Sequence, residues 1–237
     1  IRMGDRHLSM FAQDLGYGFY TKDNGGRLDI AIIECSAITE KGELVLTASC
    51  GAVPEIVQIA DKIIIEINTS IPSFEGLHDI VEPINPPNRL PYLISRVDDR
   101  AGSPYVRVDN DKIVAIIESN HPDNGRSFSE QDDTSEAIAN NIIDFFSTEV
   151  KLGRLPKSLL PLQSGVGSIA NAVIGGLAKG PFSGLKVWTE VLQDTMLALF
   201  DSGKLDFAST VSLSFSVDGF KRFYDNWDQY ANKVMMR

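Results

Sequence analysis

The stretch GLKVWTEVLQD, residues 184–194, changes its hydrophobic period at a single glutamate. Residues 185–188 are mostly apolar and predict a short buried strand, whereas residues 192–197 begin a helical pattern. Glu190 falls at the join between the two. Three interpretations follow: a surface carboxylate that ends a strand, a carboxylate that holds a ribose, or the nucleophile of an enzyme.

A glycine turn precedes this strand. The segment SGVGSIANAV, residues 164–173, contains Gly165-x-Gly167-x-x-Ala170, and Glu190 follows Gly165 by 25 residues. Such a turn lets the backbone approach an anion, and the helix after it offers free N–H groups. The pattern is typical of a dinucleotide-binding βαβ unit with Glu190 on the ribose hydroxyls. Because the pattern is short, a purely structural turn and an oxyanion site also remain open.

Apolar runs elsewhere in the chain predict the fold class. LDIAIIECSAI (residues 28–38), KIIIEIN (62–68) and KIVAIIES (112–119) are near-continuous in Ile and Val. Such runs are typical of strands covered on both faces in a parallel or mixed sheet. Pro54 can open a short helix between the first two runs. The sequence therefore predicts an α/β protein, with a proline-rich excursion over residues 70–93.

A polar stretch divides the chain into two predicted domains. SNHPDNGRSFSEQDD, residues 119–133, is rich in Pro, Gly and Asn and separates a strand from a helix. We expect residues 1–122 in a first domain, a linker over 123–133, and residues 134–237 in a second. Asp133 and Glu136 resemble a capping box for the helix that follows, and Ile138, Ile142 and Phe145 share one of its faces.

The end of the chain predicts one more helix. We expect it over residues 217–234, with aromatic side chains that pack in the core.

Composition excludes several classes of protein. The 237 residues carry a net charge of −10, which argues against general affinity for nucleic acid or anionic membranes. Cys35 and Cys50 have no paired spacing and predict free thiols. Only three histidines are present, so we expect no metal site. His78-Asp79 has no accompanying nucleophile motif, which favours a structural role over acid–base chemistry.

The wider sequence resembles a known family. SLLPLQSGVGSIANAV followed by VWTEVLQDTMLALFDSGKLDFAST resembles the acetyl-CoA hydrolase / succinyl-CoA:acetate CoA-transferase family, within the class I CoA-transferases. ADKIIIEINTSIPSFEGLHDI and TSEAIANNIIDFF are similar to the same family, in the same order. The resemblance covers nearly the whole chain. It implies two open α/β CoA-transferase-like domains with mostly parallel sheets, in a chain truncated at both ends.

The resemblance also implies a mechanism. Glu190 would be the nucleophile that attacks the thioester carbonyl of an acyl-CoA, forming an acyl-glutamyl anhydride and then a glutamyl-CoA thioester. A carboxylate acceptor such as acetate would then take over the CoA. If water takes the place of this acceptor, the net reaction is hydrolysis. A glutamate is ionised at neutral pH without an assisting base, so the rate must come from positioning and oxyanion stabilisation. The N–H of Val166 would be one oxyanion donor.

Further site residues are implied in the same way. Gly165, Gly167 and Asn171 would contact the substrate or CoA. The family's PDRN linker is replaced here by HPDNGR, so that Asn124 occupies the arginine's place and Arg126 lies two residues on. Arg126 is the candidate that would hold a substrate carboxylate by a bidentate contact.

Cofactors, partners and location complete the expectations. We expect no cofactor apart from CoA as a substrate, a homodimer, and a mitochondrial location if the source is eukaryotic or a cytoplasmic one if it is bacterial. Two alternatives remain: an NAD-dependent oxidoreductase that uses the glycine turn, and a CoA-sensing or nucleotide-sensing module without turnover.

Overall fold

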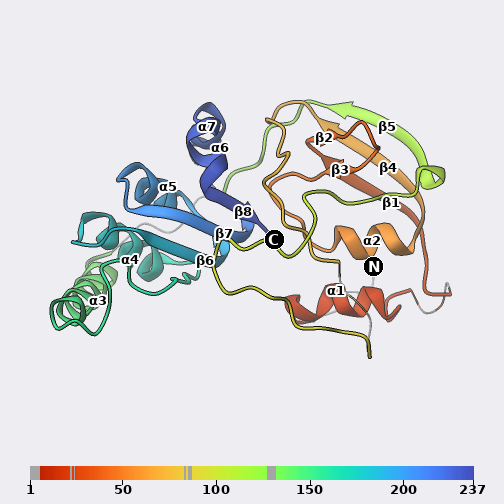
Figure 1. The fold of residues 1–237 in the computed structure, drawn as a ribbon. Coiled ribbons are helices and arrows are strands. Elements are labelled where there is room, and N and C mark those ends of the chain that lie inside the picture. The colour runs from red at the N-terminus through yellow and green to blue at the C-terminus, as the bar shows by residue number, and fades with distance from the viewer. Residues whose placement is uncertain (1–5, 22, 24, 83, 85–86, 127–131) are drawn as a thin grey trace. The chain divides into compact units, whose positions relative to one another are not determined.

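The structure is a computed structural model that describes residues 6–21, 23, 25–82, 84, 87–126 and 132–237 (Figure 1). The chain forms two compact units, the first from residues 1–93 and 100–122 and the second from 94–99 and 123–237. Residues 94–99 thus belong to the second unit, and the expected domains over residues 1–122 and 134–237 stay predictions. Residues 127–131 of the expected linker lie outside the described residues.

The first unit is built on a parallel sheet with strand order β1-β4-β5. The bounds of its elements are α1 Leu8–Gly16, β1 Leu28–Cys35, β2 Ala37–Ile38, β3 Leu44–Val45, α2 Val53–Ile59, β4 Ala60–Asn68, the 3-10 turn Asn110–Lys112, and β5 Ile113–Ser119. Pro54 lies in the first turn of α2, as predicted. The short pair β2-β3 is antiparallel. Apart from isolated bridges, the proline-rich excursion is irregular where it is described.

The isoleucine-rich strands are covered on one face only. Ile33 and Ile65 pair across β1 and β4 and are buried. On the opposite face, Ile30 and Ile32 are 55% and 66% exposed. The expectation that both faces are covered is therefore wrong for the part of the chain described, because an apolar run does not encode which face receives a partner.

The two cysteines lie in the same core. Cys35 and Cys50 are free and buried, as predicted for thiols without a pairing pattern. Burial away from water raises the pKa of each thiol to about 12. Both are therefore protonated, small apolar groups of the core rather than nucleophiles.

The second unit repeats the same construction with strand order β6-β7-β8, all parallel. Its elements are α3 Asp133–Lys151, α4 Ser168–Lys179, β6 Leu185–Leu192, α5 Asp194–Asp201, β7 Leu205–Leu213, α6 Val217–Asp225, α7 Trp227–Tyr230, the 3-10 turn Ala231–Lys233, and β8 Val234–Met236. Because β6 and β7 are parallel neighbours, their carboxyl ends lie at one edge of the sheet (Figure 1).

The expected single helix over residues 217–234 is wrong. Asn226 leaves helical geometry, with φ −117° and ψ 35°, and ends α6. β8 then pairs with β7 and buries all three of its apolar side chains, and this burial outweighs the helical periodicity. The aromatic core itself is confirmed, since Phe223 stacks on Tyr230 with ring centroids 5.5 Å apart.

The start of α3 also differs from the expectation. Asp132 is the N-cap, and its side chain accepts a hydrogen bond from the Ser135 N–H at 2.7 Å while the Ser135 hydroxyl accepts one from the Asp132 N–H. The capping box thus lies one residue before the expected Asp133-Glu136 pair. Phe145 is exposed, and Phe146 instead packs edge-on against Phe182.

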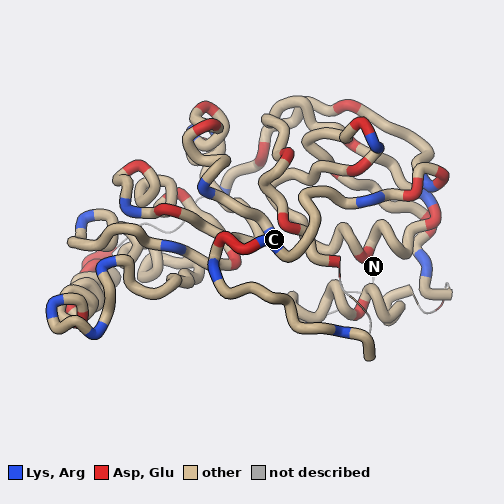
Figure 2. Tube along the Cα trace, in the orientation of Figure 1, with Lys and Arg blue, Asp and Glu red and all other residues tan. Residues whose placement is uncertain are grey.

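Acidic and basic side chains are interspersed along both units. In Figure 2, both Lys or Arg and Asp or Glu occur along the trace of each unit. None of the described helices has the length and apolarity to cross a membrane.

Candidate active site

Glu190 lies in β6 near the carboxyl end of the strand. Its neighbours Thr189 and Leu192 are buried, whereas the Glu190 side chain is exposed. Alternation along the strand directs Glu190 to the face opposite Thr189. In the described part of the chain, no group forms a hydrogen bond or ion pair with the Glu190 carboxylate. This carboxylate is therefore available to a ligand.

The segment before α4 runs beside β6. Leu162 forms a parallel bridge with Val187, and the Trp188 N–H donates to the Leu162 carbonyl at 2.8 Å. Further along, the Thr189 hydroxyl donates to the Ser164 carbonyl at 2.8 Å. Thus the glycine turn is held alongside the strand that carries Glu190.

The last contact in this series comes from Gln193, which precedes α5. Its Nε2 donates to the Gly165 carbonyl at 3.1 Å, and the Ser164 hydroxyl donates to the same oxygen at 3.2 Å. The contacts from Thr189 and Gln193 bracket Glu190 along the chain. These contacts place residues 164–165 beside the strand that carries Glu190, and the use of the turn as a ribose site or an oxyanion site stays a prediction.

The turn leaves an N–H group free beside the strand. Val166 is 63% exposed, and none of the described residues accepts a hydrogen bond from its N–H. Gly167 has φ +144°, a conformation that favours glycine, and directly precedes α4. Gly165 has an ordinary φ, and a Cβ placed there would meet nothing within 4 Å. The turn therefore requires glycine at 167 and leaves open space over 165.

Asn171 lies in α4 and is buried. Its Oδ1 accepts a hydrogen bond from the Thr195 hydroxyl of α5 at 3.3 Å. The side chain therefore links two helices beneath the turn. In this arrangement its contact is with the fold, and the role in substrate or CoA binding implied by the resemblance stays a prediction.

Arg126 reaches the same edge of the sheet by a backbone contact. Its N–H donates to the Phe215 carbonyl at 2.9 Å, just after the end of β7. The next residue, Ser216, is held by Asp194, whose carboxylate accepts from the Ser216 N–H and hydroxyl, each at 3.0 Å. Arg126 is exposed. Its backbone thus lies next to the end of β7, and the role of its guanidinium in holding a substrate carboxylate stays a prediction.

A cation also lies on the Glu190 face of the sheet. The Arg237 guanidinium stacks on the Trp188 ring, 4.4 Å from its centroid, and donates to Ser209 Oγ at 2.7 Å and to the Asp99 carbonyl at 2.6 Å. These contacts commit Arg237 to the fold and hold residues 97–99 against the sheet.

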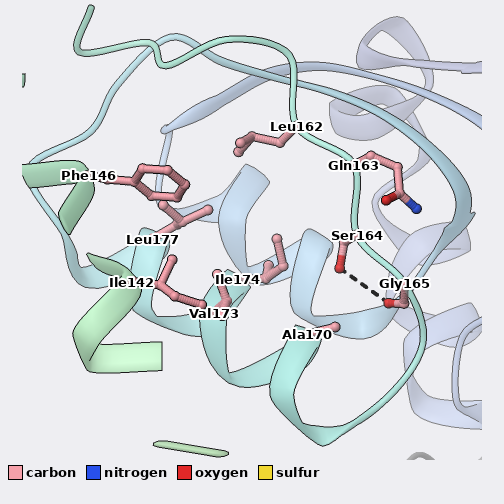
Figure 3. A pocket seen from close by; sticks show the side chains of 10 residues that line it. All are labelled: Ile142, Phe146, Leu162, Gln163, Ser164, Gly165, Ala170, Val173, Ile174 and Leu177. Carbon is pink, nitrogen blue, oxygen red and sulfur yellow. Dashed lines mark hydrogen bonds between the residues drawn. The ribbon is translucent and has the colours of Figure 1, made fainter. Parts of the chain in front are cut away.

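A cavity of about 220 Å³ lies between α3, α4 and the segment before the turn. Figure 3 shows Ile142, Phe146, Ile174 and Leu177 around it, with the Ser164–Gly165 hydrogen bond at its edge. None of its ten lining residues is charged. The cavity therefore offers a mostly apolar wall behind the turn and no charged partner for an anionic group among its lining residues.

Other sequence candidates have structural places. His78 is fully buried and its Nε2 lies 3.1 Å from the Thr47 carbonyl, while Asp79 accepts hydrogen bonds from the Ala101 and Gly102 N–H groups. Burial lowers the pKa of His78 to about 4. His78-Asp79 thus anchors the proline-rich excursion. Within the described ranges, no cluster of three or more His, Cys, Asp or Glu side chains could hold a metal.

Sequence reasoning missed Thr189 and Gln193 as parts of the site. Both stand within the quoted stretch around Glu190, and both are buried polar residues. The available signal was polarity at the end of an apolar strand, where a buried polar group must find a partner. The identity of that partner depends on a segment 25 or more residues away, so no local pattern could reveal it.

Comparisons with known proteins agree on one family. Residues 1–118 match the model of the acetyl-CoA hydrolase/transferase N-terminal domain. The chain is 58% identical to an acetyl-CoA hydrolase of Schizosaccharomyces pombe and 57% identical to one of Neurospora crassa, covering 100% of this chain and 46% and 45% of those relatives. The chain thus spans about half the length of the curated relatives it matches.

Solved structures agree on the fold. A 4-hydroxybutyrate CoA-transferase from Porphyromonas gingivalis matches with a TM-score of 0.65 and 16% identity, over 99% of this chain and 49% of that one. RipA from Yersinia pestis also matches with a TM-score of 0.65 and 16% identity, over 100% of this chain and 45% of that one. The predicted α/β fold with mostly parallel sheets is confirmed.

Proposed function

Because this chain belongs to the acetyl-CoA hydrolase/transferase family, we propose that it supplies the nucleophile of an enzyme that transfers or hydrolyses CoA thioesters, and that Glu190 is this nucleophile. The observation that carries the proposal is a Glu190 carboxylate without a partner among the described residues, in a strand whose neighbouring residues hold a glycine turn. The Val166 N–H of that turn also has no acceptor within the described chain. A nucleophile and an oxyanion donor are the two groups that acyl transfer from a thioester requires.

The proposed reaction has two covalent stages. In the first, a Glu190 carboxylate oxygen bonds to the thioester carbonyl carbon, and the C–S bond breaks to give an acyl-glutamyl anhydride and CoA thiolate. In the second, the thiolate attacks the glutamyl carbonyl and releases the acyl group as a free carboxylate, which leaves a glutamyl-CoA thioester. An acceptor carboxylate regenerates an acyl-CoA by the reverse path, and water in its place gives net hydrolysis.

Each step passes through a tetrahedral oxyanion. The Val166 N–H is the proposed donor to that oxygen, and one such donor contributes about 3–4 kcal/mol to transition-state stabilisation. Gly165 and Gly167 border the same space, and the absence of a side chain at Gly165 leaves room there for the thioester. Arg126, an exposed cation at the same sheet edge, is the proposed partner of the substrate carboxylate.

The nucleophile is tested by trapping. Acetyl-CoA is added to the full-length protein, hydroxylamine is added, and peptides are examined by mass spectrometry. We expect a CoA-dependent hydroxamate on Glu190, because hydroxylamine attacks the carbonyl of the glutamyl-CoA thioester and releases CoA. Glu190→Gln should abolish this product and lower turnover by at least about 10³-fold, since the covalent path is lost.

The matched control is Asp206→Asn. Asp206 is an exposed carboxylate near the amino end of β7, in the same sheet as Glu190, and its replacement should leave the trapped product unchanged. Retention of near wild-type turnover by Glu190→Gln would sink the proposal. Saturable NAD binding that weakens in Glu190→Ala would favour the oxidoreductase alternative, and CoA binding without a covalent product would favour a sensing module.

The remaining properties of the protein are proposals of the same kind. Acetyl-CoA and succinyl-CoA are the proposed thioesters and small carboxylates such as acetate the proposed acceptors, with no cofactor apart from CoA as substrate. The homodimer and the mitochondrial or cytoplasmic location stay predictions. Size-exclusion chromatography with light scattering tests the first, and fractionation of the source cells tests the second.

A further inference from the structure

The hydrogen bond from Gln193 reaches the peptide group that carries the proposed oxyanion donor. Gln193 is 2% exposed, and its Nε2 donates to the Gly165 carbonyl oxygen at 3.1 Å. That oxygen and the Val166 N–H belong to one peptide group. In the planar trans form of a peptide, the C=O and N–H bonds point in opposite directions. A side chain that holds the oxygen therefore also sets the direction of the N–H.

The turn itself supplies little to hold this peptide in place. Gly165 has no Cβ, and the space where one would stand is empty to 4 Å. Val166 is exposed. Glycine also has wide backbone freedom, so the orientation of the peptide depends on what grips its oxygen. The grip comes from Gln193 and from the weaker, longer contact of the Ser164 hydroxyl at 3.2 Å.

The same hydrogen bond strengthens the donor. A hydrogen bond accepted by a peptide oxygen polarises the amide, so that its N–H becomes a better donor on the opposite side. The tilt of the N–H and its donor strength are therefore both set by Gln193. Oxyanion stabilisation depends on such preorganisation, because no reorganisation is then needed when charge develops.

The unfavourable burial of the Gln193 amide also supports a role for its hydrogen bond to the Gly165 carbonyl. Its Oε1 is buried without a hydrogen-bond partner among the described residues, which is an unfavourable arrangement. The amide cannot be turned over to avoid it, because the Gly165 oxygen can only accept and must face the NH₂ group. An apolar side chain of the same size would fill this space without that penalty, but it would not hold the Gly165 oxygen.

We infer that Gln193 is a positioning residue for catalysis, which orients and polarises the Val166 N–H through the Gly165 carbonyl. The inference rests on the proposed function. It assigns to Gln193 a role that acts on the transition state and not on the binding of CoA.

The test uses two replacements of similar size, Gln193→Met and Gln193→Glu, in the full-length protein. Neither the thioether nor an ionised carboxylate can donate to the Gly165 oxygen. We expect kcat to fall by about 10- to 100-fold in both, less than for loss of the donor itself, with KM and the Kd for CoA within about twofold of wild type. The rate of hydroxylamine-trapped product on Glu190 should fall by the same factor as kcat.

The matched control is Ser202→Ala at the other end of α5. The Ser202 hydroxyl also donates to a backbone carbonyl, that of Leu199 at 2.8 Å. We expect Ser202→Ala to lose about as much unfolding free energy as the Gln193 variants and to keep the wild-type kcat. If Gln193→Met is unfolded by circular dichroism, Gln193→Glu decides the outcome.

The outcomes separate the two ideas. If wild type forms the Glu190 product but both Gln193 variants keep kcat within about twofold, the positioning role is refuted while the proposed function stands. A rise in KM and in the Kd for CoA that matches the loss of kcat would also refute it, because that pattern marks a distorted site. If wild type forms no product on Glu190, the proposed function fails and the positioning role fails with it.

Discussion

At the residue scale, the Glu190 side chain differs from those of its neighbours in forming no hydrogen bond or ion pair with the described residues. Thr189 is committed to the Ser164 carbonyl and Gln193 to the Gly165 carbonyl, and Asp194 is committed to Ser216. The Glu190 backbone carbonyl accepts from the Thr210 hydroxyl at 3.1 Å, but its carboxylate forms no such contact within the described chain. The polar neighbours of Glu190 thus hold other segments in place, whereas its carboxylate has no partner among the described residues, as the proposed nucleophile requires.

His78 gives a prediction of pH-dependent stability at the same scale. Burial lowers its pKa from 6.5 to about 4, so the unfolded chain binds a proton more readily than the folded one. Stability is therefore lost as the pH falls from 6.5 toward 4, by up to about 3 kcal/mol. We expect the urea midpoint, followed by far-UV circular dichroism, to fall over this range.

His78→Gln removes the titrating group and should flatten this pH dependence, whereas His121→Gln, at an exposed position, should leave it unchanged. An equal slope in wild type and His78→Gln would contradict the prediction.

At the scale of elements, the glycine turn before α4 makes two different demands. Gly167 has φ +144° and ψ 171°, a region open essentially to glycine alone. Gly165 has ordinary φ and empty space around it. The first glycine of the motif thus provides room for a ligand, and the second provides a backbone conformation.

These roles predict different costs for the same substitution. Gly167→Ala should lower the free energy of unfolding by about 1–3 kcal/mol, because it imposes backbone strain. Gly165→Ala should leave it within about 1 kcal/mol of wild type. Urea unfolding followed by tryptophan fluorescence measures both, since Trp188 and Trp227 lie in the second unit, as the turn does. Equal losses of unfolding free energy in Gly165→Ala and Gly167→Ala would contradict the prediction that the two glycines have different roles.

At the scale of the whole molecule, the second unit contains a segment that lies between β4 and β5 of the first unit in the sequence. Residues 94–99 belong to the unit that otherwise begins at residue 123. Arg237 secures this segment through the Asp99 carbonyl and stacks on Trp188. The hydrogen bond between Arg237 and Asp99, which are 138 positions apart in the chain, thus holds residues 94–99 in the second unit.

Arg237→Lys tests that closure. A lysine cannot both stack on the indole and donate to separated acceptors as a planar guanidinium does. We expect a loss of about 1–2 kcal/mol in the free energy of unfolding, with a changed Trp188 emission in the folded state. The control is Arg154→Lys, since Arg154 pairs with Glu149 at an exposed site, and it should cost less than about 0.5 kcal/mol. Similar losses in the two variants would contradict the role of Arg237.

Some elements of the fold could be predicted from the sequence, and others could not. The strands β1, β4, β5 and β6 and the helix that contains Pro54 were predicted, because hydrophobic period and turn residues are local signals. β8 was read as helix, since Val234 continues a helical pattern and only pairing with β7 makes it a strand. The sequence pattern grouped Phe145 with Ile138 and Ile142 on one face of α3, but Phe145 is exposed and Phe146 packs against Phe182.

By itself, the sequence determined the α/β class and the free thiols, because residue type and hydrophobic period carry that information, and its resemblance to a family indicated the residues around which acyl-transfer chemistry is proposed. Only the tertiary structure decided which groups touch. It placed Gln193 on the Gly165 oxygen, turned Asn171 toward Thr195, and left one face of the isoleucine-rich strands exposed. Each of these depends on segments distant in the chain, and a distant contact is selected by the free energy of the whole packed unit rather than by the local pattern.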